Sequence, residues 1–223
     1  MMKLRVLFGV AGLALVITAS AQTALIKKLD RYSSIVSQES DLIPASRKEQ
    51  LTSLADMIIS ANLKDGNSSL IFTDETNSGV SQIAQAFLQA SIAKKGLAKV
   101  NIFSAGNTES AIDKQAIELL KSAGFSIECN TNFKKNPHYL LNYSWSENRI
   151  MLFSKKMDNF QIPATNLIVV SLDGNSVNDS PAINNKQSIP YGVVNETTLK
   201  EIAREMFFIA EKVQNNQLLS HQQ

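Results

Sequence analysis

Thiols and imidazoles are scarce in this sequence. Among its 223 residues there is one cysteine, Cys129, and there are two histidines, His138 and His221. A single thiol excludes an internal disulfide and a redox pair of cysteines. With so few of these side chains, we expect no metal site of the usual His and Cys type.

A surplus of charge of one sign is also missing. The chain has 22 basic and 20 acidic side chains. Two of the basic ones, Lys3 and Arg5, lie in the first 21 residues, which contain no acidic residue, so 20 of each sign remain in the rest of the chain. A basic footprint for nucleic acid is therefore absent, and we expect no nucleic-acid partner.

The first residues, MMKLRVLFGVAGLALVITASAQ, have the pattern of a signal peptide. A basic start precedes an uncharged apolar run over residues 6–17, and small residues follow at 19–21. The run is shorter than the roughly 20 residues of a membrane-spanning helix. We predict a signal peptide over residues 1–21, cleavage between Ala21 and Gln22, and an exported protein, periplasmic or secreted, without a stable membrane anchor.

Residues 22–66 are predicted to form an N-terminal helical extension packed on the core. In its second half, Leu51, Leu54, Ile58 and Leu63 recur at helical spacing, and the stretch KDG ends the pattern at Gly66. A coiled-coil arm for a partner is the rival interpretation, which the lack of sustained heptads disfavours.

Strands and helices alternate over residues 67–215, followed by a tail at 216–223 that we expect to be frayed. Predicted strands cover residues 69–73, 99–104, 125–129 and 166–171, and predicted helices cover 81–95, 111–123 and 196–213. Residues 138–154 read as a β-hairpin, and residues 172–191 as a polar loop. The alternation predicts an α/β domain with a mainly parallel sheet of about four strands.

The stretch LIFTDETNSGVSQIAQAFL, residues 70–88, reads as a strand, a loop of small residues and a helix. In such a loop, backbone N–H groups and the positive end of the helix form an anion site. The candidate loop contains no Lys, Arg or Cys, and two acidic residues lie in it. Its residues are Asp74, Glu75, Thr76, Asn77, Ser78, Gly79, Val80 and Ser81.

The run NSGVSQIAQAFL and the following VNIFSAGNTESAIDKQAIELLKSAGFSI resemble the low-molecular-weight protein tyrosine phosphatases and the related thioredoxin-coupled arsenate reductases. Those proteins carry a strand, then C-x5-R-S, a helix and a strand that ends in Ser-Ala-Gly, which here stands at residues 104–106. The resemblance looks closest to a subgroup of tyrosine phosphatases from Bacteroidetes-type bacteria, with a helical N-terminal extension and an inserted hairpin. It covers roughly residues 27–213 and implies a three-layer α/β sandwich.

This resemblance places Asp74 at the nucleophilic cysteine and Val80 at the arginine of the family pattern. In the family, a thiolate attacks phosphorus or arsenic while the arginine holds two oxygens of the oxyanion. Valine can do neither task. The Asp74 carboxylate would repel phosphate, and it is able to fold into the loop amides as an internal anion. Phosphatase or reductase activity through a thiol is therefore nearly excluded.

Three functions remain open. The first is an exported pseudophosphatase with a binding or structural role, whose partner is a protein or a small molecule, and which needs no cofactor. The second is a metal-assisted hydrolase in which Asp74, Glu75 and Asp173 hold a divalent cation; Asp173 follows a predicted strand, where the family keeps its general acid. The third is an oxyanion-binding protein that uses the amides of Ser78, Gly79 and Ser81.

Four other residues favour structural interpretations. We expect Cys129 to be a buried thiol, because it lies in a short predicted strand far from the loop. We expect Tyr143 and Trp145 to pack in the predicted hairpin or to lie on an edge strand. His138 follows Pro137, and no Ser or Cys partner can be assigned to it.

Overall fold

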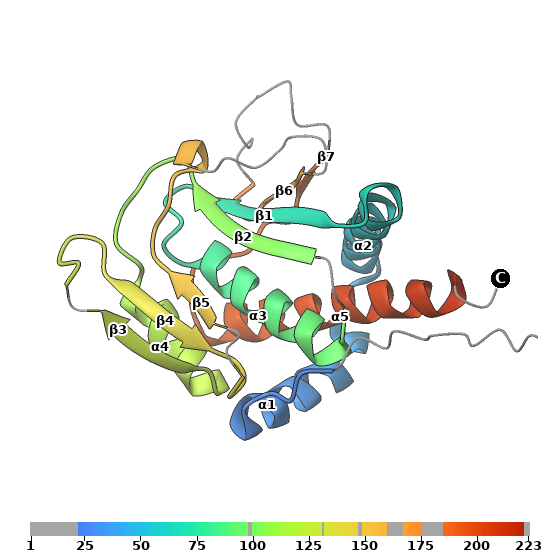
Figure 1. The fold of residues 1–223 in the computed structure, drawn as a ribbon, viewed down its shortest axis with the longest axis horizontal. Helices are drawn as coiled ribbons and strands as arrows, with labels where there is room; N and C mark the ends of the chain where they lie inside the picture. Colours follow the sequence, from blue (N-terminus) through green and yellow to red (C-terminus); the bar gives the residue numbers. More distant parts are fainter. Residues whose placement is uncertain are drawn as a thin grey trace, which may run out of the picture.

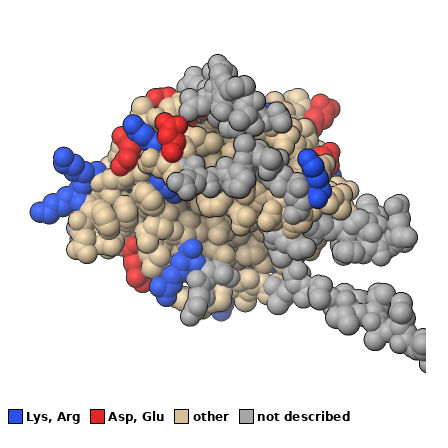
Figure 2. Space-filling model, turned by 45° about the horizontal axis from the view of Figure 1, so that its top comes forward, with Lys and Arg blue, Asp and Glu red and all other residues tan. Residues whose placement is uncertain are grey.

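The computed structural model describes residues 22–97, 100–130, 132–146, 149–159, 167–174 and 185–220. The predicted signal peptide at residues 1–21 lies outside these ranges. Within them, no helix combines the length and the apolar character that crossing a bilayer requires. Basic and acidic side chains are both scattered over the face that Figure 2 shows.

A parallel sheet of four strands forms the centre of the molecule (Figure 1). Its order is β2 (Val100–Gly106), β1 (Ser68–Asp74), β6 (Leu167–Ser171) and β7 (Asn185–Ser188), and every neighbouring pair is parallel. All five residues of β6 are buried, as expected of an apolar strand inside a parallel sheet. The predicted α/β fold with a parallel four-stranded sheet is confirmed.

The strand β7 corrects one prediction, because it lies within the segment that we predicted to be a polar loop. Its sequence, Asn-Lys-Gln-Ser, has no apolar pattern. It joins the edge of the sheet through backbone pairing with β6, and its Gln187 side chain donates to the Gln50 carbonyl at 2.7 Å. An edge strand of this kind leaves little trace in the sequence.

Helices gather on one face of the sheet (Figure 1). There α3 (Val80–Lys95) packs against β1, β2 and α5 (Glu196–Ser220), and α1 (Lys27–Gln38) packs on α5. Leu70 and Phe72 of β1 belong to this large core, whereas Ile71 faces the opposite side. On that side, Ile71 belongs to a smaller cluster, against which Met157 of the short turn η2 (Met157–Asn159) packs.

The N-terminal extension packs on the same core. It consists of α1, the turn η1 (Ser40–Leu42) and α2 (Ala45–Asp65), and α2 contacts both α5 and β1. The predicted face of α2 is buried at Leu51, Leu54 and Ile58. Leu63, in the last turn before Gly66, is 74% exposed, so its predicted place on that face was wrong.

A second, antiparallel sheet lies beside the helices. Its order is β3 (Ser126–Asn130), β4 (His138–Asn142) and β5 (Arg149–Leu152). The strands β4 and β5 are the predicted hairpin. The third predicted strand, β3, pairs with this hairpin and does not enter the parallel sheet.

Three residues in or directly after the strands of this sheet differ in their exposure to solvent. Cys129 lies on the edge strand β3 and is exposed, so the prediction of a buried thiol was wrong. Tyr143 is buried in the core, as expected. Trp145, in the turn after β4, is 79% exposed and does not pack in the hairpin.

The boundaries of two helices also differ from the predicted ones. The helix α4 (Lys114–Ala123) begins later than predicted, because the Asp113 side chain caps it by accepting from the Gln115 N–H at 2.8 Å. The N–H of Ser110 instead donates to the Ser154 hydroxyl at 2.9 Å. The helix α5 continues to Ser220, into the predicted frayed tail.

Candidate functional site

The candidate loop connects the carboxyl end of β1 to the first turn of α3. The last residue of β1, Asp74, pairs with Gly106 at the end of β2. Ligand sites of open α/β sheets lie at this end of the strands. The structure therefore places the loop where a phosphate site is expected.

The Asp74 carboxylate points into the loop. Its Oδ1 accepts a hydrogen bond from the Asn77 N–H at 2.5 Å, and its Oδ2 accepts one from the Ser81 N–H at 2.9 Å. An external oxyanion in a loop of this kind would be held by such N–H groups. Here the two N–H groups are engaged by a side chain of the same loop.

Burial raises the pKa of Asp74 above its usual value. The hydrogen bonds from Ser81 and Asn77 act in the opposite sense, and the nearby charge of Asp173 adds to the rise. Burial is the larger influence because water is removed from the carboxylate. The loop thus carries a carboxyl group whose charge is poorly hydrated and depends on the two amides.

Asn77 is the centre of the hydrogen bonding within the loop. Its side chain is fully buried, and its φ of 50° lies in the left-handed region, which asparagine adopts more readily than most residues. Its Nδ2 donates to the Ser81 hydroxyl at 2.8 Å. Its Oδ1 accepts from Gln82 Nε2 at 2.9 Å and from the Lys155 N–H at 3.0 Å. These bonds fix the loop to α3 and to the segment after β5.

The Ser-Ala-Gly end of β2 supports the loop from outside. A Cβ on Gly106 would lie 2.6 Å from the Asn77 nitrogen and 2.8 Å from the Thr76 carbonyl carbon, so the loop backbone needs a glycine there. The Ser104 hydroxyl donates to Gln85 Oε1 of α3 at 2.7 Å. Both contacts explain why this strand end accompanies a loop of this shape.

The three carboxylates of the proposed cation site have different partners. Asp74 is bonded to loop amides, Glu75 accepts from Asn107 Nδ2 at 3.1 Å, and Asp173 accepts from the Ser171 hydroxyl at 3.0 Å. In the described part of the chain, no three His, Cys, Asp or Glu side chains are arranged to hold a metal ion. The binding of a divalent cation by Asp74, Glu75 and Asp173 stays a prediction.

Lys155 lies beside the loop and was missed in the sequence. Its N–H donates to Asn77, and its carbonyl accepts from the Gly106 N–H at 2.8 Å. Its ammonium group lies 4.8 Å from the centroid of the Phe153 ring, and burial lowers its pKa to about 8. No local pattern marks this residue, because only the fold brings the segment after β5 to the loop.

The solved structures that are similar to this chain include the following three. A thioredoxin-dependent arsenate reductase from Corynebacterium glutamicum is 15% identical, covers 86% of this chain and 97% of its own, and has a TM-score of 0.41. A YwlE mutant from Bacillus subtilis is 13% identical, covers 66% and 99%, and has a TM-score of 0.46. A low molecular weight phosphotyrosine phosphatase from Vibrio cholerae O395 is 13% identical, covers 69% and 99%, and has a TM-score of 0.43.

The family comparison agrees with the sequence motifs. No curated protein matches the chain. Residues 69–140, which include the whole loop and the Ser-Ala-Gly strand end, match the model of the low molecular weight phosphotyrosine protein phosphatase family. The predicted resemblance to the low-molecular-weight tyrosine phosphatases is thus confirmed over these residues.

Proposed function

We propose that this protein is an exported, catalytically inactive relative of the low-molecular-weight phosphatases that acts by binding a protein or a small molecule. The observation that carries this proposal is the position of the Asp74 carboxylate. Both of its oxygens accept hydrogen bonds from backbone amides of its own loop. The Asp74 carboxylate therefore occupies the place in the loop where an external anion would bind.

The residue types in the loop support the loss of catalysis. Strand β1 ends at Asp74 and helix α3 begins at Val80, which agrees with Asp74 at the family's cysteine and Val80 at its arginine. A valine offers no donor to a phosphoryl oxygen. Loss of one preorganised donor typically lowers a rate by roughly 100- to 1,000-fold, and here the thiol nucleophile is missing as well.

Charge repulsion argues against an oxyanion in the same loop. Two like unit charges 4 Å apart repel by about 4 kcal/mol near a protein surface. A phosphate near the Ser81 amide would meet the Asp74 carboxylate within the loop, where no Lys or Arg offsets it. The amides of Ser78, Gly79 and Ser81 are therefore a poor external anion site while Asp74 is ionised.

Assay of the purified protein with an aryl phosphate over a range of pH tests this proposal. We expect no turnover above the uncatalysed rate, with or without Mg²⁺ or Mn²⁺. Turnover that disappears in Asp74→Ala but persists in Asp41→Ala, a change at an exposed carboxylate, would refute it. Turnover that disappears in Cys129→Ser would refute it as well, because it would assign the chemistry to the exposed thiol.

Export is tested separately by fractionating cells that produce the protein with a C-terminal tag. We expect the tagged protein outside the cytoplasm, with Gln22 as its first residue. An intact N-terminus in the cytoplasmic fraction would contradict this part of the proposal and would leave the interpretation of the loop unchanged.

A further inference from the structure

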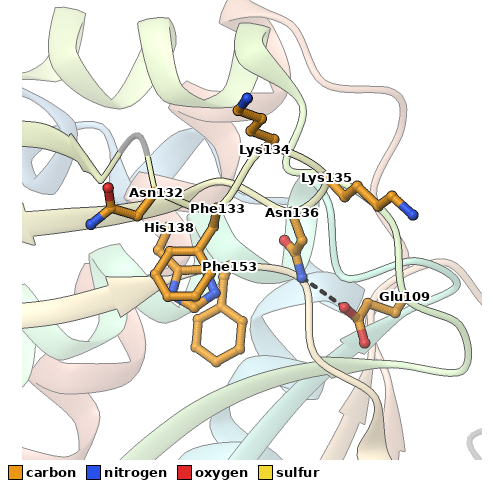
Figure 3. Close-up of a pocket in the computed structure, with 8 residues that line it drawn as sticks. All are labelled: Glu109, Asn132, Phe133, Lys134, Lys135, Asn136, His138 and Phe153. Carbon is orange, nitrogen blue, oxygen red and sulfur yellow. Dashed lines mark hydrogen bonds between the residues drawn. The ribbon is translucent and has the colours of Figure 1, made fainter.

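A cavity lies beside the loop and shares no residue with it (Figure 3). Its volume is about 500 Å³, within the range of roughly 300–1,000 Å³ that is usual for small-molecule sites. Its walls come from the loop after β2, the segment before β4 and the segment after β5. The lining residues are Glu109, Asn132, Phe133, Lys134, Lys135, Asn136, His138 and Phe153.

Three rings stack in one column on the wall of this cavity (Figure 3). The ring centroids of Phe133 and His138 are 3.8 Å apart with an interplanar angle of 11°. Those of His138 and Phe153 are 4.2 Å apart with an angle of 29°. His138 covers one face of Phe133, yet Phe133 is still 46% exposed. The column therefore ends in an aromatic surface that another planar ring can cover.

Two phenyl rings stack on the imidazole of His138. Among the described residues it makes no hydrogen bond to the protein, although two phenyl rings fix its plane. Its ring nitrogens are thus free to donate to, or accept from, a molecule in the cavity. A polar ring that is fixed in this way beside an exposed phenyl ring is suited to a ligand that is both aromatic and polar.

The charge around the cavity is mainly positive. Lys134 and Lys135 extend from its rim (Figure 3), and the Lys155 ammonium lies near the Phe153 ring. The one carboxylate in the lining, Glu109, accepts from Asn136 Nδ2 at 2.9 Å. A ligand that brings negative charge to this rim would be attracted by the lysines.

Hydrogen bonds fix the polar wall of the cavity. Asn136 donates to the Ser154 carbonyl at 2.8 Å and accepts from the Ser154 N–H at 3.1 Å. The Ser154 hydroxyl in turn donates to the Thr76 carbonyl at 2.7 Å. The wall is therefore built before a ligand arrives, which reduces the entropy lost on binding.

We propose that this cavity binds a planar aromatic anion of the mononucleotide type. The aromatic ring stacks on the exposed surface of Phe133, and the anionic group lies at the rim beside Lys134 and Lys135. His138, one ring further along the column, is left to hydrogen-bond to a part of the ligand outside the stacked ring. The site is independent of the Asp74 carboxylate, so it does not rest on the loss of catalysis.

Isothermal titration calorimetry with AMP, adenosine and inorganic phosphate tests this site in the purified protein. We expect AMP to bind more tightly than either adenosine or phosphate. Phe133→Ala should weaken AMP binding by roughly 5- to 100-fold, the range that a stacked base accounts for, and Phe133→Trp should restore it. The double variant Lys134→Gln/Lys135→Gln should weaken AMP and leave adenosine unchanged.

Matched controls separate this site from general surface effects. Trp145→Ala removes a more exposed ring outside the cavity, and Lys27→Gln/Lys64→Gln removes two exposed lysines elsewhere; both should leave AMP binding unchanged. Absence of AMP binding at millimolar concentration would overturn the proposal. Equal affinities for AMP and phosphate, or an AMP affinity that is the same in folded Phe133→Ala, would overturn it too.

Discussion

The N–H of Ser81, in the first turn of α3, donates to Asp74 Oδ2 at 2.9 Å across a separation of seven residues. With the bond from the Asn77 N–H to Oδ1, it closes the segment between β1 and α3 into a ring around its own carboxylate. The Asp74 carboxylate thus lies at the position that the N–H groups of this loop surround.

Substitution of Gly106 by alanine should disturb the loop. The added Cβ would lie within 3.0 Å of backbone atoms of Glu75, Thr76 and Asn77, which cannot turn away as a side chain can. Overpacking of this kind destabilises a protein by roughly 1–3 kcal/mol. Chemical denaturation of the wild-type protein and of Gly106→Ala measures the difference.

Gly192→Ala is the control for this prediction. There the nearest atom to the new Cβ is the Thr198 hydroxyl at 3.8 Å, an ordinary contact. Its free energy of unfolding should stay within about 0.5 kcal/mol of wild type. If Gly106→Ala and Gly192→Ala change the free energy of unfolding equally, the loop backbone does not pack closely against Gly106 at the end of β2.

Loss of the Glu205 carboxylate should loosen the N-terminal extension. Arg47 of α2 donates from Nε to both oxygens of Glu205 at 3.0 Å, and the Tyr191 hydroxyl also donates to Glu205. The Glu205 side chain is 1% exposed and that of Arg47 is 13% exposed. Removal of one partner of a buried pair destabilises by about 3–5 kcal/mol, which we expect for Glu205→Ala in urea unfolding.

The exposed ion pair of Lys48 with Asp41 offers a comparison in the same helix. It has an N···O distance of 3.7 Å, and the Asp41 side chain is almost fully exposed. Lys48→Ala should therefore change the free energy of unfolding by no more than about 1 kcal/mol. If Glu205→Ala has no larger effect than Lys48→Ala, the extension is not held by the buried pair.

Lys155 should destabilise the folded state as long as it is charged. Burial lowers its pKa from 10.5 to about 8, so the folded state binds fewer protons than the unfolded state between these two values. Stability then rises with pH across that window, relative to a variant without the amine. Between pH 8 and 10.5, we expect the free energy of unfolding of the wild-type protein to rise relative to that of Lys155→Met.

Acetylation kinetics give an independent measurement of the same group. A neutral amine is the reactive form, and we expect half-maximal reactivity of Lys155 near pH 8, read by mass spectrometry of peptides with the exposed Lys64 as reference. A flat stability difference together with a half-maximal reactivity near 10.5 would contradict the burial of this ammonium group.

Local sequence patterns predicted the elements that form the loop. The boundaries of β1 and α3 and the Ser-Ala-Gly end of β2 all follow from apolar periodicity and small residues in one continuous stretch. The sequence left two positions open for the Asp74 side chain: bonded to the loop amides, or at a cation site with Glu75 and Asp173. In the structure, the carboxylate is bonded to the loop amides. The sequence could not predict this, because the spacing of apolar residues does not show where a polar side chain points.

Other features depend on contacts between distant segments and were not predictable. The strand β7 is polar because it lies at an edge and needs only backbone pairing. Cys129 lies on an edge strand whose partner is the hairpin, so burial could not be inferred from its neighbours in sequence. The column of Phe133, His138 and Phe153 forms only when β4 and β5 pair.

Titration of inorganic phosphate into wild type and Asp74→Ala tests the central claim most directly. Removal of the carboxylate frees the Asn77 and Ser81 N–H groups, so the account predicts that phosphate binds Asp74→Ala and not wild type. An added Phe133→Ala substitution should leave this binding unchanged, because Phe133 lines the separate cavity beside the loop. Phosphate binding by the wild-type protein that is lost in Asp74→Ala would contradict the account, because Asp74 would then support an external anion instead of replacing it.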